Sequence, residues 1–475
     1  MSRNTKLIIF FCLIIMTYIP MLWIDYYRDD LFRSTSGLYG WAHLGRPMAV
    51  LLASLLSGCT GILLDSSPIP QLVAIAFLCL TFYFLSVELT TRYNTNEMTS
   101  SVASLVLVCS PFLLQNMAYK YDSSGMFLAF FLSTISAIVG FRKRGALSSI
   151  ALMLLSLCIY QPATNVFLGV TSILLTASIY SQNNKLFSAL KSASVNITFY
   201  MLSMLIYKAL FSIMSSEERS STLPLNMMYN GVIHNVILFT DIIKSINFPL
   251  LYIAVSSLIV ISVVYTLYNK TIPSKISVLF ISVSISILSI AGPLLILKDA
   301  NNFPRVMMSS MSVLSCLIVY ISNGFFRKIT TYISLAFVFG VLSLSCIISN
   351  SIRNQNEYEN MILTSINSVL AMDSVVNSKF IFDGTMPVNK RTSIAMNSIP
   401  YLKYIIQPSS RWMIIEKFRN MGNANLSYNI IGSLSDEERN NICAKTPNRI
   451  AEHFTLFYSK SYTLVSFNKL KNIDC

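Results

Sequence analysis

The feature that most constrains this chain is a series of long apolar runs separated by short polar stretches. Eleven runs are candidates for membrane-spanning helices, and most are long enough for a hydrocarbon core of about 30 Å. They cover residues 7–24, 70–90, 99–117, 125–140, 146–160, 162–180, 194–212, 247–268, 276–297, 306–323 and 329–350. Only 12% of the residues are charged, whereas soluble domains carry about 25%. We therefore expect a mainly α, polytopic membrane protein of about 11 transmembrane helices.

The apolar run at 47–64 decides the orientation of every later loop. If it does not cross and the N-terminus is cytoplasmic, the cytoplasmic loops hold 12 Lys and Arg residues and two acidic residues, as the positive-inside rule requires. The outward loops up to residue 350 then hold nine residues of each sign. We interpret 47–64 as an interfacial or re-entrant helix on the outer face, which begins at Pro47. The net charge of +14 thus reflects topology, and we expect no nucleic-acid partner.

This topology divides the chain into two domains. Residues 1–350 form the transmembrane domain, in which 25–69 is the first outward loop. Residues 351–475 form an outward C-terminal domain, in which a helical stretch near 356–372 and alternating, strand-like runs such as 456–467 indicate a small α/β fold. Cys443 and Cys475 both lie in this domain, and a location outside the cytoplasm predicts a disulfide between them.

The first outward loop concentrates ionisable groups beside the membrane. It holds three carboxylates and three arginines, namely Asp25, Arg28, Asp29, Asp30, Arg33 and Arg46. Such groups are costly at membrane depth and usually persist for a function, although a solvated loop with aromatic anchors is the alternative. A carboxylate can accept a proton from an attacking hydroxyl. Because neighbours on a helix point about 100° apart, only one of Asp29 and Asp30 easily faces a substrate, and we favour Asp30.

Several other outward residues suit the binding of a sugar phosphate. Arginine forks match phosphate oxygens and stabilise the charge that develops on them. The candidate cations are Arg33, Arg46, Lys120 and Arg305, of which Lys120 is equally explained by snorkelling to lipid headgroups. The candidate sugar-binding residues are Trp41, Asp122, Gln161 and Asn165. A proline turn between two spans explains Pro162 but leaves Gln161 and Asn165 without a role.

Some kinds of site have no counterpart in the sequence. There is no phosphate-gripping GxxxxGK loop, no GxSxG elbow, and no His-rich metal set among His43, His234 and His453. We therefore expect neither a bound nucleotide nor a metal or other cofactor, because arginines can hold an anionic leaving group.

The spacing of these residues resembles a known family. The pattern comprises Tyr26-x-x-Asp29-Asp30-x-x-Arg33, Gly37, Trp41, Gly45-Arg46-Pro47, Tyr121-Asp122 and Tyr160-Gln161. It is similar to the phage-type, serotype-converting O-antigen glucosyltransferases, the Gtr family, and the resemblance runs along most of the chain. The combination of Asp-Asp with Gly-Arg-Pro is the specific part, whereas Tyr-Gln alone is not.

The resemblance implies a glycosyltransferase of the GT-C class in the bacterial inner membrane. Such an enzyme takes a glucosyl group from undecaprenyl phosphate glucose and attaches it to a sugar of lipid-carried O-antigen in the periplasm. An aspartate of the first outward loop is the expected base, which carries over to Asp29 or Asp30. A flippase for lipid-linked sugar and an O-antigen polymerase or ligase remain as alternatives. Charges on one face and the lack of a visible repeat favour an enzyme over a transporter.

Overall fold

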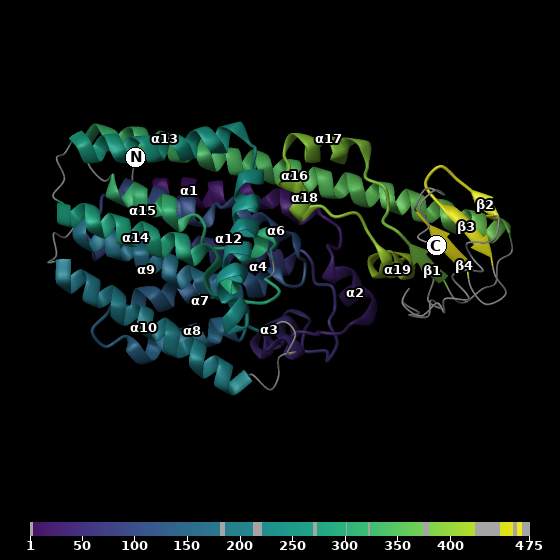
Figure 1. Cartoon of the computed structure of the whole chain (residues 1–475), viewed down its shortest axis with the longest axis horizontal. Helices are drawn as coiled ribbons and strands as arrows, with labels where there is room; N and C mark the ends of the chain where they lie inside the picture. The colour runs from purple at the N-terminus through teal and green to yellow at the C-terminus, as the bar shows by residue number, and fades with distance from the viewer. Residues whose placement is uncertain are drawn as a thin grey trace. The chain divides into compact units, whose positions relative to one another are not determined.

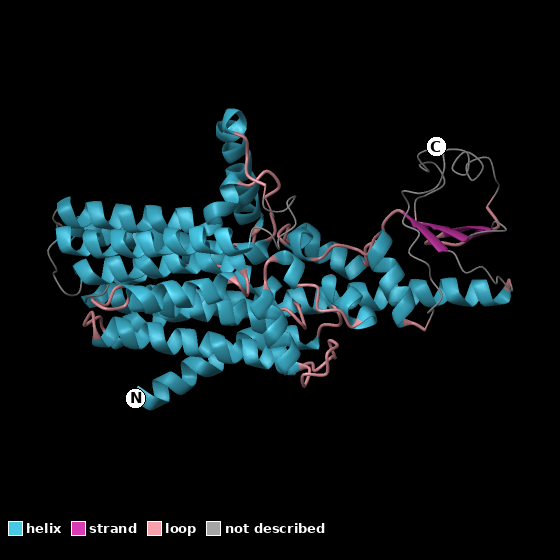
Figure 2. Cartoon of the chain, turned by 90° about the horizontal axis from the view of Figure 1, so that it is seen from below, coloured by secondary structure: helices cyan, strands magenta, loops and turns pink. Residues whose placement is uncertain are grey.

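The structure is a computed structural model of the 475-residue chain. It describes residues 3–180, 186–211, 221–268, 273–300, 302–321, 324–373, 380–422, 447–458 and 463–467. Most described residues are helical and one small sheet is present, so the prediction of a mainly α fold is confirmed (Figures 1 and 2). The chain divides into two compact units. The first holds Met1–Trp23, Leu38–Ile347 and Ile399–Ile405, and the second holds Ile24–Gly37, Ile348–Ser398 and Ile406–Cys475.

The first unit is a helical bundle (Figure 1). Its α-helices are α1 (Arg3–Tyr18), α3 (Pro47–Leu56), α4 (Ile69–Thr91), α5 (Glu97–Val108), α6 (Leu114–Ala118), α7 (Ser123–Gly140), α8 (Ala146–Leu157), α9 (Asn165–Tyr180), α10 (Leu186–Phe211), α12 (Met228–Ser245), α13 (Pro249–Tyr268), α14 (Pro273–Ala291), α15 (Ser312–Tyr320), α18 (Leu402–Ile405) and the first part of α16 (Gly324–Met372). Short 3-10 turns are η1 (Ile19–Trp23), η2 (Ala42–Leu44), η3 (Pro111–Leu113), η4 (Gln161–Thr164), η5 (Leu225–Met227), η6 (Gly292–Ile296) and η7 (Pro304–Val306).

Nine helical segments within the described residues are long and apolar enough to cross a membrane. They are Asn4–Trp23, Ile69–Thr91, Glu97–Ala118, Ser123–Gly140, Gln161–Tyr180, Leu186–Phe211, Pro249–Tyr268, Lys275–Ile296 and Gly324–Met372. The other two predicted spans contain α8, with 12 residues, and α15, with nine. A 12-residue helix is about 18 Å long, short of a core of about 30 Å. The chain is a multi-pass membrane protein, while the count of eleven crossings stays a prediction.

The predicted helix at 47–64 is shorter than its apolar run. Helix α3 begins at Pro47, as expected, but ends at Leu56 after ten residues. The chain then turns through Ser57 and Gly58, whose φ of 70° suits glycine. At about 15 Å, α3 alone is too short to span a bilayer. Its place at the membrane surface stays a prediction.

The centre of the first unit is built from helices with small polar side chains. The span containing α5 and the span containing α9 each have 89% of their apolar window buried, against 17% for α10. Helix α9 packs against α14 and α15, where Gly169 leaves no room for a side chain beside Ser309 and Ser312. Small residues allow close helix packing in membranes, where lipid is as apolar as leucine. The exposed apolar face of α10 therefore suits contact with lipid.

The second unit combines helices with a four-stranded sheet. Its strands are β1 (Phe380–Asp383), β2 (Arg449–Ile450), β3 (Thr455–Tyr458) and β4 (Thr463–Ser466), in the order β1-β4-β3-β2. Strand β1 runs parallel to β4 and the other neighbours are antiparallel. Its helices are α2 (Asp29–Ser36), α17 (Lys390–Ser398), α19 (Arg411–Asn420) and the last part of α16. Ile366, Phe382, Phe418 and Val465 form part of its apolar core.

Helix α16 belongs to both units. The sequence pattern treated a span at 329–350 and a helical stretch at 356–372 as separate elements, but they form one helix of 49 residues. No Gly or Pro interrupts residues 351–355, so nothing stops the helix there. The predicted domain boundary after residue 350 therefore falls inside α16, close to the division after Ile347. Cys443 and Cys475 lie outside the described residues, and their disulfide stays a prediction.

Candidate active site

Arg46 lies where the first loop meets α3, next to the helix-starting Pro47. Its Nε donates a hydrogen bond to Gln161 Oε1 over 2.7 Å. The guanidinium carbon lies 4.8 Å from the centre of the Tyr160 ring, a cation–π contact. Within the described part of the chain, the side chain of Arg46 makes no other hydrogen bond, so its two terminal nitrogens remain for a ligand.

The amide nitrogen of the Gln161 side chain is also held by hydrogen bonds. Its Nε2 donates to the Leu44 carbonyl at 3.0 Å and to the Tyr207 hydroxyl at 2.8 Å. Tyr207 in turn donates to the Gly45 carbonyl at 2.7 Å. Helix α8 ends at Leu157, and Pro162 is the second residue of the short turn η4, where its ring suits the start of a helical turn. The amide of Gln161 thus fixes the orientation of Arg46.

Arg305 is held by both its backbone and its side chain. Its backbone N–H donates to Gln115 Oε1 at 3.0 Å, and its carbonyl accepts from Asn116 Nδ2 at 3.0 Å and from the Tyr160 hydroxyl at 3.3 Å. Its guanidinium donates to the Tyr119 hydroxyl and lies 5.1 Å from the centre of that ring. Tyr160 therefore contacts both arginines of the first unit's site.

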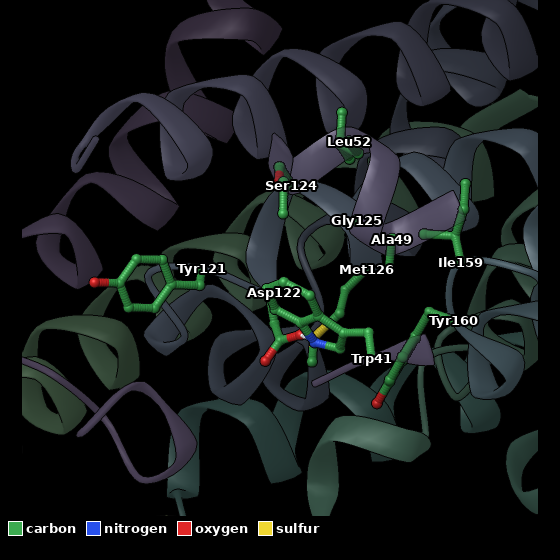
Figure 3. A pocket seen from close by; sticks show the side chains of 11 residues that line it. Trp41, Ala49, Leu52, Tyr121, Asp122, Ser124, Gly125, Met126, Ile159 and Tyr160 are labelled. Atoms are coloured by element: carbon green, nitrogen blue, oxygen red, sulfur yellow. Dashed lines mark hydrogen bonds between the residues drawn. The ribbon is translucent and has the colours of Figure 1, made fainter. Parts of the chain in front are cut away.

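Asp122 is the carboxylate of this group. It immediately precedes α7, and the indole N–H of the buried Trp41 donates to it. Both residues line a pocket together with Tyr121, Met126 and Tyr160 (Figure 3). We call Trp41, Arg46, Asp122, Tyr160, Gln161 and Arg305 the arginine cluster.

The electrostatics of the arginine cluster suit an anion. Desolvation lowers the pKa of the Arg46 guanidinium, and Tyr160 and Asp122 oppose this while Arg305 adds to it. Arg46 lies in a loop outside the candidate spans. The arginine cluster holds two arginines and one aspartate, so its formal net charge is +1. A phosphate there would relieve the repulsion between the two cations.

Asp29 and Asp30 belong to the second unit, as does Arg33. Both aspartates lie in the first turn of α2, where the helix dipole favours negative charge. Asp30 is fully buried and its carboxylate accepts from the Tyr27 backbone N–H at 3.3 Å, whereas Asp29 is partly exposed. The structure thus groups the predicted site residues into two sets, one in each unit.

Helix α2 is fixed to α19 by polar contacts within the second unit. Thr35 Oγ1 donates to Glu416 at 2.5 Å, and Glu416 pairs with Arg419 at 3.1 Å. Glu416 is fully buried, so removal of either partner would leave a charge in an apolar setting. The two aspartates therefore lie on an anchored helix.

The remaining predicted site residues divide between a loop and the bundle core. Lys120 is half-buried in the loop that leads to α7. Asn165 is 1% exposed, and its Nδ2 donates to the Ala291 carbonyl at 3.2 Å. That bond holds the end of α14 where Gly292 adopts a φ of 52°. A sugar-binding role for Asn165 stays a prediction. In this structure its amide nitrogen is used for the contact with Ala291.

Four residues of this region carry no predicted role: Gln115, Asn116, Tyr119 and Tyr207. Gln115 and Asn116 are consecutive buried amides inside an apolar run, and that pattern alone could have singled them out. Tyr207 lies in α10 within an ordinary apolar run, which gives no comparable signal.

A family model matches the part of the chain that holds these residues. The family model "Glucosyl transferase GtrII" matches residues 18–322, which include both aspartates of α2 and the whole arginine cluster. The chain belongs to the GtrII glucosyl transferase family. The predicted resemblance to the phage-type glucosyltransferases is thus confirmed.

One curated relative shows where similar proteins occur. A protein of Salmonella phage P22, described as an uncharacterized 55.3 kDa protein in the gtrB 5' region, is 26% identical over 254 residues. That stretch covers 50% of this GtrII family member and 51% of the phage protein, so the match spans about half of each. No solved structure gives a significant match.

Proposed function

We propose that this GtrII family member transfers a glucosyl group from undecaprenyl phosphate glucose to a sugar of O-antigen, on the periplasmic face of the bacterial inner membrane. The family model supports glucosyl transfer, and the gtrB-region relative supports a phage serotype-conversion context. The nine long apolar helices among the described residues support a membrane location and a lipid-linked donor. In this orientation the N-terminus is cytoplasmic and the C-terminal domain is periplasmic.

The observation that carries the proposal is the hydrogen bonding of the Arg46 guanidinium. Its Nε is used to fix the side chain against Gln161, while its terminal nitrogens have no hydrogen-bond partner among the described residues. This is the arrangement that a bidentate phosphate site needs. Arg305 adds a second cation, and Lys120 and Arg33 are further candidates.

The reaction is a single displacement. The acceptor hydroxyl loses its proton to the carboxylate of Asp29 or Asp30, and its oxygen forms a bond to the anomeric carbon of glucose. The bond from that carbon to the phosphate oxygen breaks, and Arg46 and Arg305 stabilise the negative charge left on the lipid phosphate. Asp29 has exposed surface for this role, whereas Asp30 needs a movement of α2 to reach a hydroxyl.

The glucose ring lies beside the carboxylate and amide groups of the first unit in this proposal. Asp122 and Gln161 can bind its hydroxyls, and Trp41, which donates to Asp122, supports the carboxylate; Asn165 is a further candidate. Because arginines supply the positive charge, the reaction needs no metal or other cofactor. Membrane lipids surround the spans and no nucleic acid is involved.

The decisive experiment weighs the O-antigen repeat unit. The protein is expressed in a host that makes both a defined O-antigen and undecaprenyl phosphate glucose, and we expect the repeat to gain one hexose. Asp29→Asn and Asp30→Asn are compared with Asp25→Asn, an exposed carboxylate of the same loop. We expect at least one of the first two to abolish the gain at unchanged abundance, while Asp25→Asn keeps it.

Two results would overturn the proposal. Unchanged glucosylation in both Asp29→Asn and Asp30→Asn would remove the catalytic base. A longer polysaccharide of unchanged repeat mass would indicate a polymerase, and movement of lipid-linked sugar without any gain of hexose would indicate a flippase.

A further inference from the structure

A second polar pocket lies wholly within the second unit. Its lining includes Tyr26 from the segment before α2, Asn356 and Glu359 from α16, Ser409, and Lys417 from α19. None of these residues belongs to the arginine cluster. The pocket therefore requires its own explanation.

Glu359 at the base of this pocket is saturated with hydrogen bonds. Its Oε1 accepts from Gln355 Nε2 at 2.8 Å and from the Ser409 backbone N–H at 2.9 Å. Its Oε2 accepts from Ser409 Oγ at 2.5 Å and from Lys417 Nζ at 2.6 Å. With four donors on two oxygens, the buried carboxylate of Glu359 has a structural task, which is to hold Lys417 in place.

Lys417 retains a donor that the protein does not use. Its ammonium carries three N–H groups, and the acceptors it has within the described chain are Glu359 and Asn356, the latter at 2.9 Å. The side chain is only 7% exposed, so its third N–H has little access to bulk water. Asn356 accepts through Oδ1, and its own amide N–H groups have no acceptor among the residues described. Two buried or half-buried donors thus line one pocket.

The size and charge of the pocket define the ligand. The room for a water-sized group in this partly open pocket is about 30 Å³, enough for a hydroxyl group or a water molecule rather than a sugar ring. The lining also holds Arg28. At the donors of Lys417 and Asn356 themselves, the carboxylate of Glu359 neutralises the ammonium, so a neutral hydroxyl oxygen suits these donors better than a phosphate, which the carboxylate would repel. Tyr26 also lines the pocket and is partly exposed, so its aromatic ring can pack against the apolar face of a sugar.

We propose that this pocket binds the acceptor saccharide by one of its hydroxyl groups, with the sugar ring outside against Tyr26. The inference rests on the proposed glucosyl transfer and assigns its acceptor. Tyr26 lies three residues before Asp29, so the acceptor site and the candidate bases occupy one anchored segment of the same unit. Asn356, Glu359 and Lys417 lie beyond residue 322, where the family match ends.

The test uses Asn356→Asp in the full-length protein. The aspartate keeps an acceptor for Lys417 but removes both amide donors, so the fold is preserved while the hydroxyl contact is lost. The matched control is Asn360→Asp, which adds the same charge on an exposed position one turn further along α16. Transfer kinetics are measured with purified undecaprenyl phosphate glucose and the host's lipid-linked O-antigen.

We expect Asn356→Asp to raise the KM for the acceptor about tenfold, the effect of one lost hydrogen bond, with an unchanged KM for the donor. Asn360→Asp should match the wild type. Equal acceptor KM values in the two variants, or a parallel rise in the donor KM, would overturn the inference. Tyr26→Ala is a second variant, and Tyr26→Phe, which keeps the ring, should retain acceptor binding.

A binding measurement separates this inference from the proposed function. The polysaccharide released from the host's O-antigen by mild acid is titrated against wild type and Asn356→Asp in detergent. Weaker polysaccharide binding by the variant supports the pocket even if the wild type transfers no hexose, a result that would refute the proposed function alone. Loss of binding to undecaprenyl phosphate with unchanged polysaccharide binding would assign the pocket to the lipid carrier and overturn the inference.

Discussion

Arg46 and Gln161 lie 115 residues apart in the chain and are joined by a hydrogen bond of 2.7 Å between Arg46 Nε and Gln161 Oε1. The bond uses Nε and leaves the two terminal nitrogens of the guanidinium, which can form an end-on fork to a phosphate. Gln161 is held in turn by Leu44 and Tyr207. The orientation of a charged side chain in the first loop therefore depends on the turn between α8 and α9.

Substitution Gln161→Ala tests this dependence. Loss of a hydrogen bond to a charged group costs about 1.5–3 kcal/mol, so we expect kcat/KM for undecaprenyl phosphate glucose to fall about 10- to 100-fold. Gln161→Glu keeps an acceptor for Arg46 but loses the donors to Leu44 and Tyr207. Its activity should lie between those of the wild type and Gln161→Ala. Wild-type donor kinetics in Gln161→Ala would show that Arg46 does not need this support.

Gly45 offers a second test of the same support. Its φ is 71°, and a Cβ there would lie 2.5 Å from the Tyr207 hydroxyl, so Gly45→Ala should displace Tyr207 and lower transfer about tenfold through the lost contact with Gln161. Gly40 is the control, because its φ of 68° gives a similar backbone strain with nothing within 4 Å of the added Cβ. Equal rates for Gly40→Ala and Gly45→Ala would attribute the loss to backbone strain alone.

The sequence predicted the membrane-spanning helices well because their signal is local. Apolar length and basic loops identify a span without knowledge of its neighbours. Each of the nine long apolar helices in the part of the chain that the structure describes overlaps a predicted run. Helix α3 is the exception in length: its run continues to residue 64, but Ser57 and Gly58 end the helix earlier. Helix α16 was predicted as two elements, a span at 329–350 and a helical stretch ending at Met372. Hydropathy falls between them, whereas helix propensity does not.

The grouping of site residues depended on long-range packing and was predicted only in part. The assignment of Arg46, Gln161 and Arg305 to one side of the membrane anticipated that they lie near each other. The positioning role of Tyr207 had no sequence signal, since it depends on how α10 packs beside η2 and η4. The assignment of Ile24–Gly37 to the second unit also depends on contacts between α2 and α19, which are about 380 residues apart in the chain.

Removal of divalent metal should leave glucosyl transfer unchanged. In the proposed reaction Arg46 and Arg305 supply the positive charge that a metal would otherwise provide. Membranes washed with EDTA should transfer glucose at the rate of untreated membranes, with no stimulation by added Mg²⁺ or Mn²⁺. Activity lost on washing and restored by Mn²⁺ would assign the charge compensation to a metal ion instead.

Acid should weaken the second unit through Asp373, which directly follows α16. Arg449 Nη2 donates to it at 2.7 Å and the Tyr458 hydroxyl at 2.6 Å, and these hydrogen bonds lower the pKa of Asp373 to about 2. In the unfolded chain the pKa of an aspartate is about 3.9. The ionised form therefore stabilises the folded unit above about pH 4, and this contribution is lost as the pH falls toward 2.

The measurement of this acid sensitivity uses the full-length protein with Trp23→Phe and Trp41→Phe, which leaves Trp412 of α19 as the remaining tryptophan. Denaturant unfolding is followed by its fluorescence at several pH values between 5 and 2.5. The stability difference between the parent and Asp373→Asn should shrink as the pH falls, whereas Asp25→Asn, at an exposed carboxylate, should leave the pH profile unchanged. A constant difference across this range would show that the contacts with Arg449 and Tyr458 do not depend on the ionisation of Asp373.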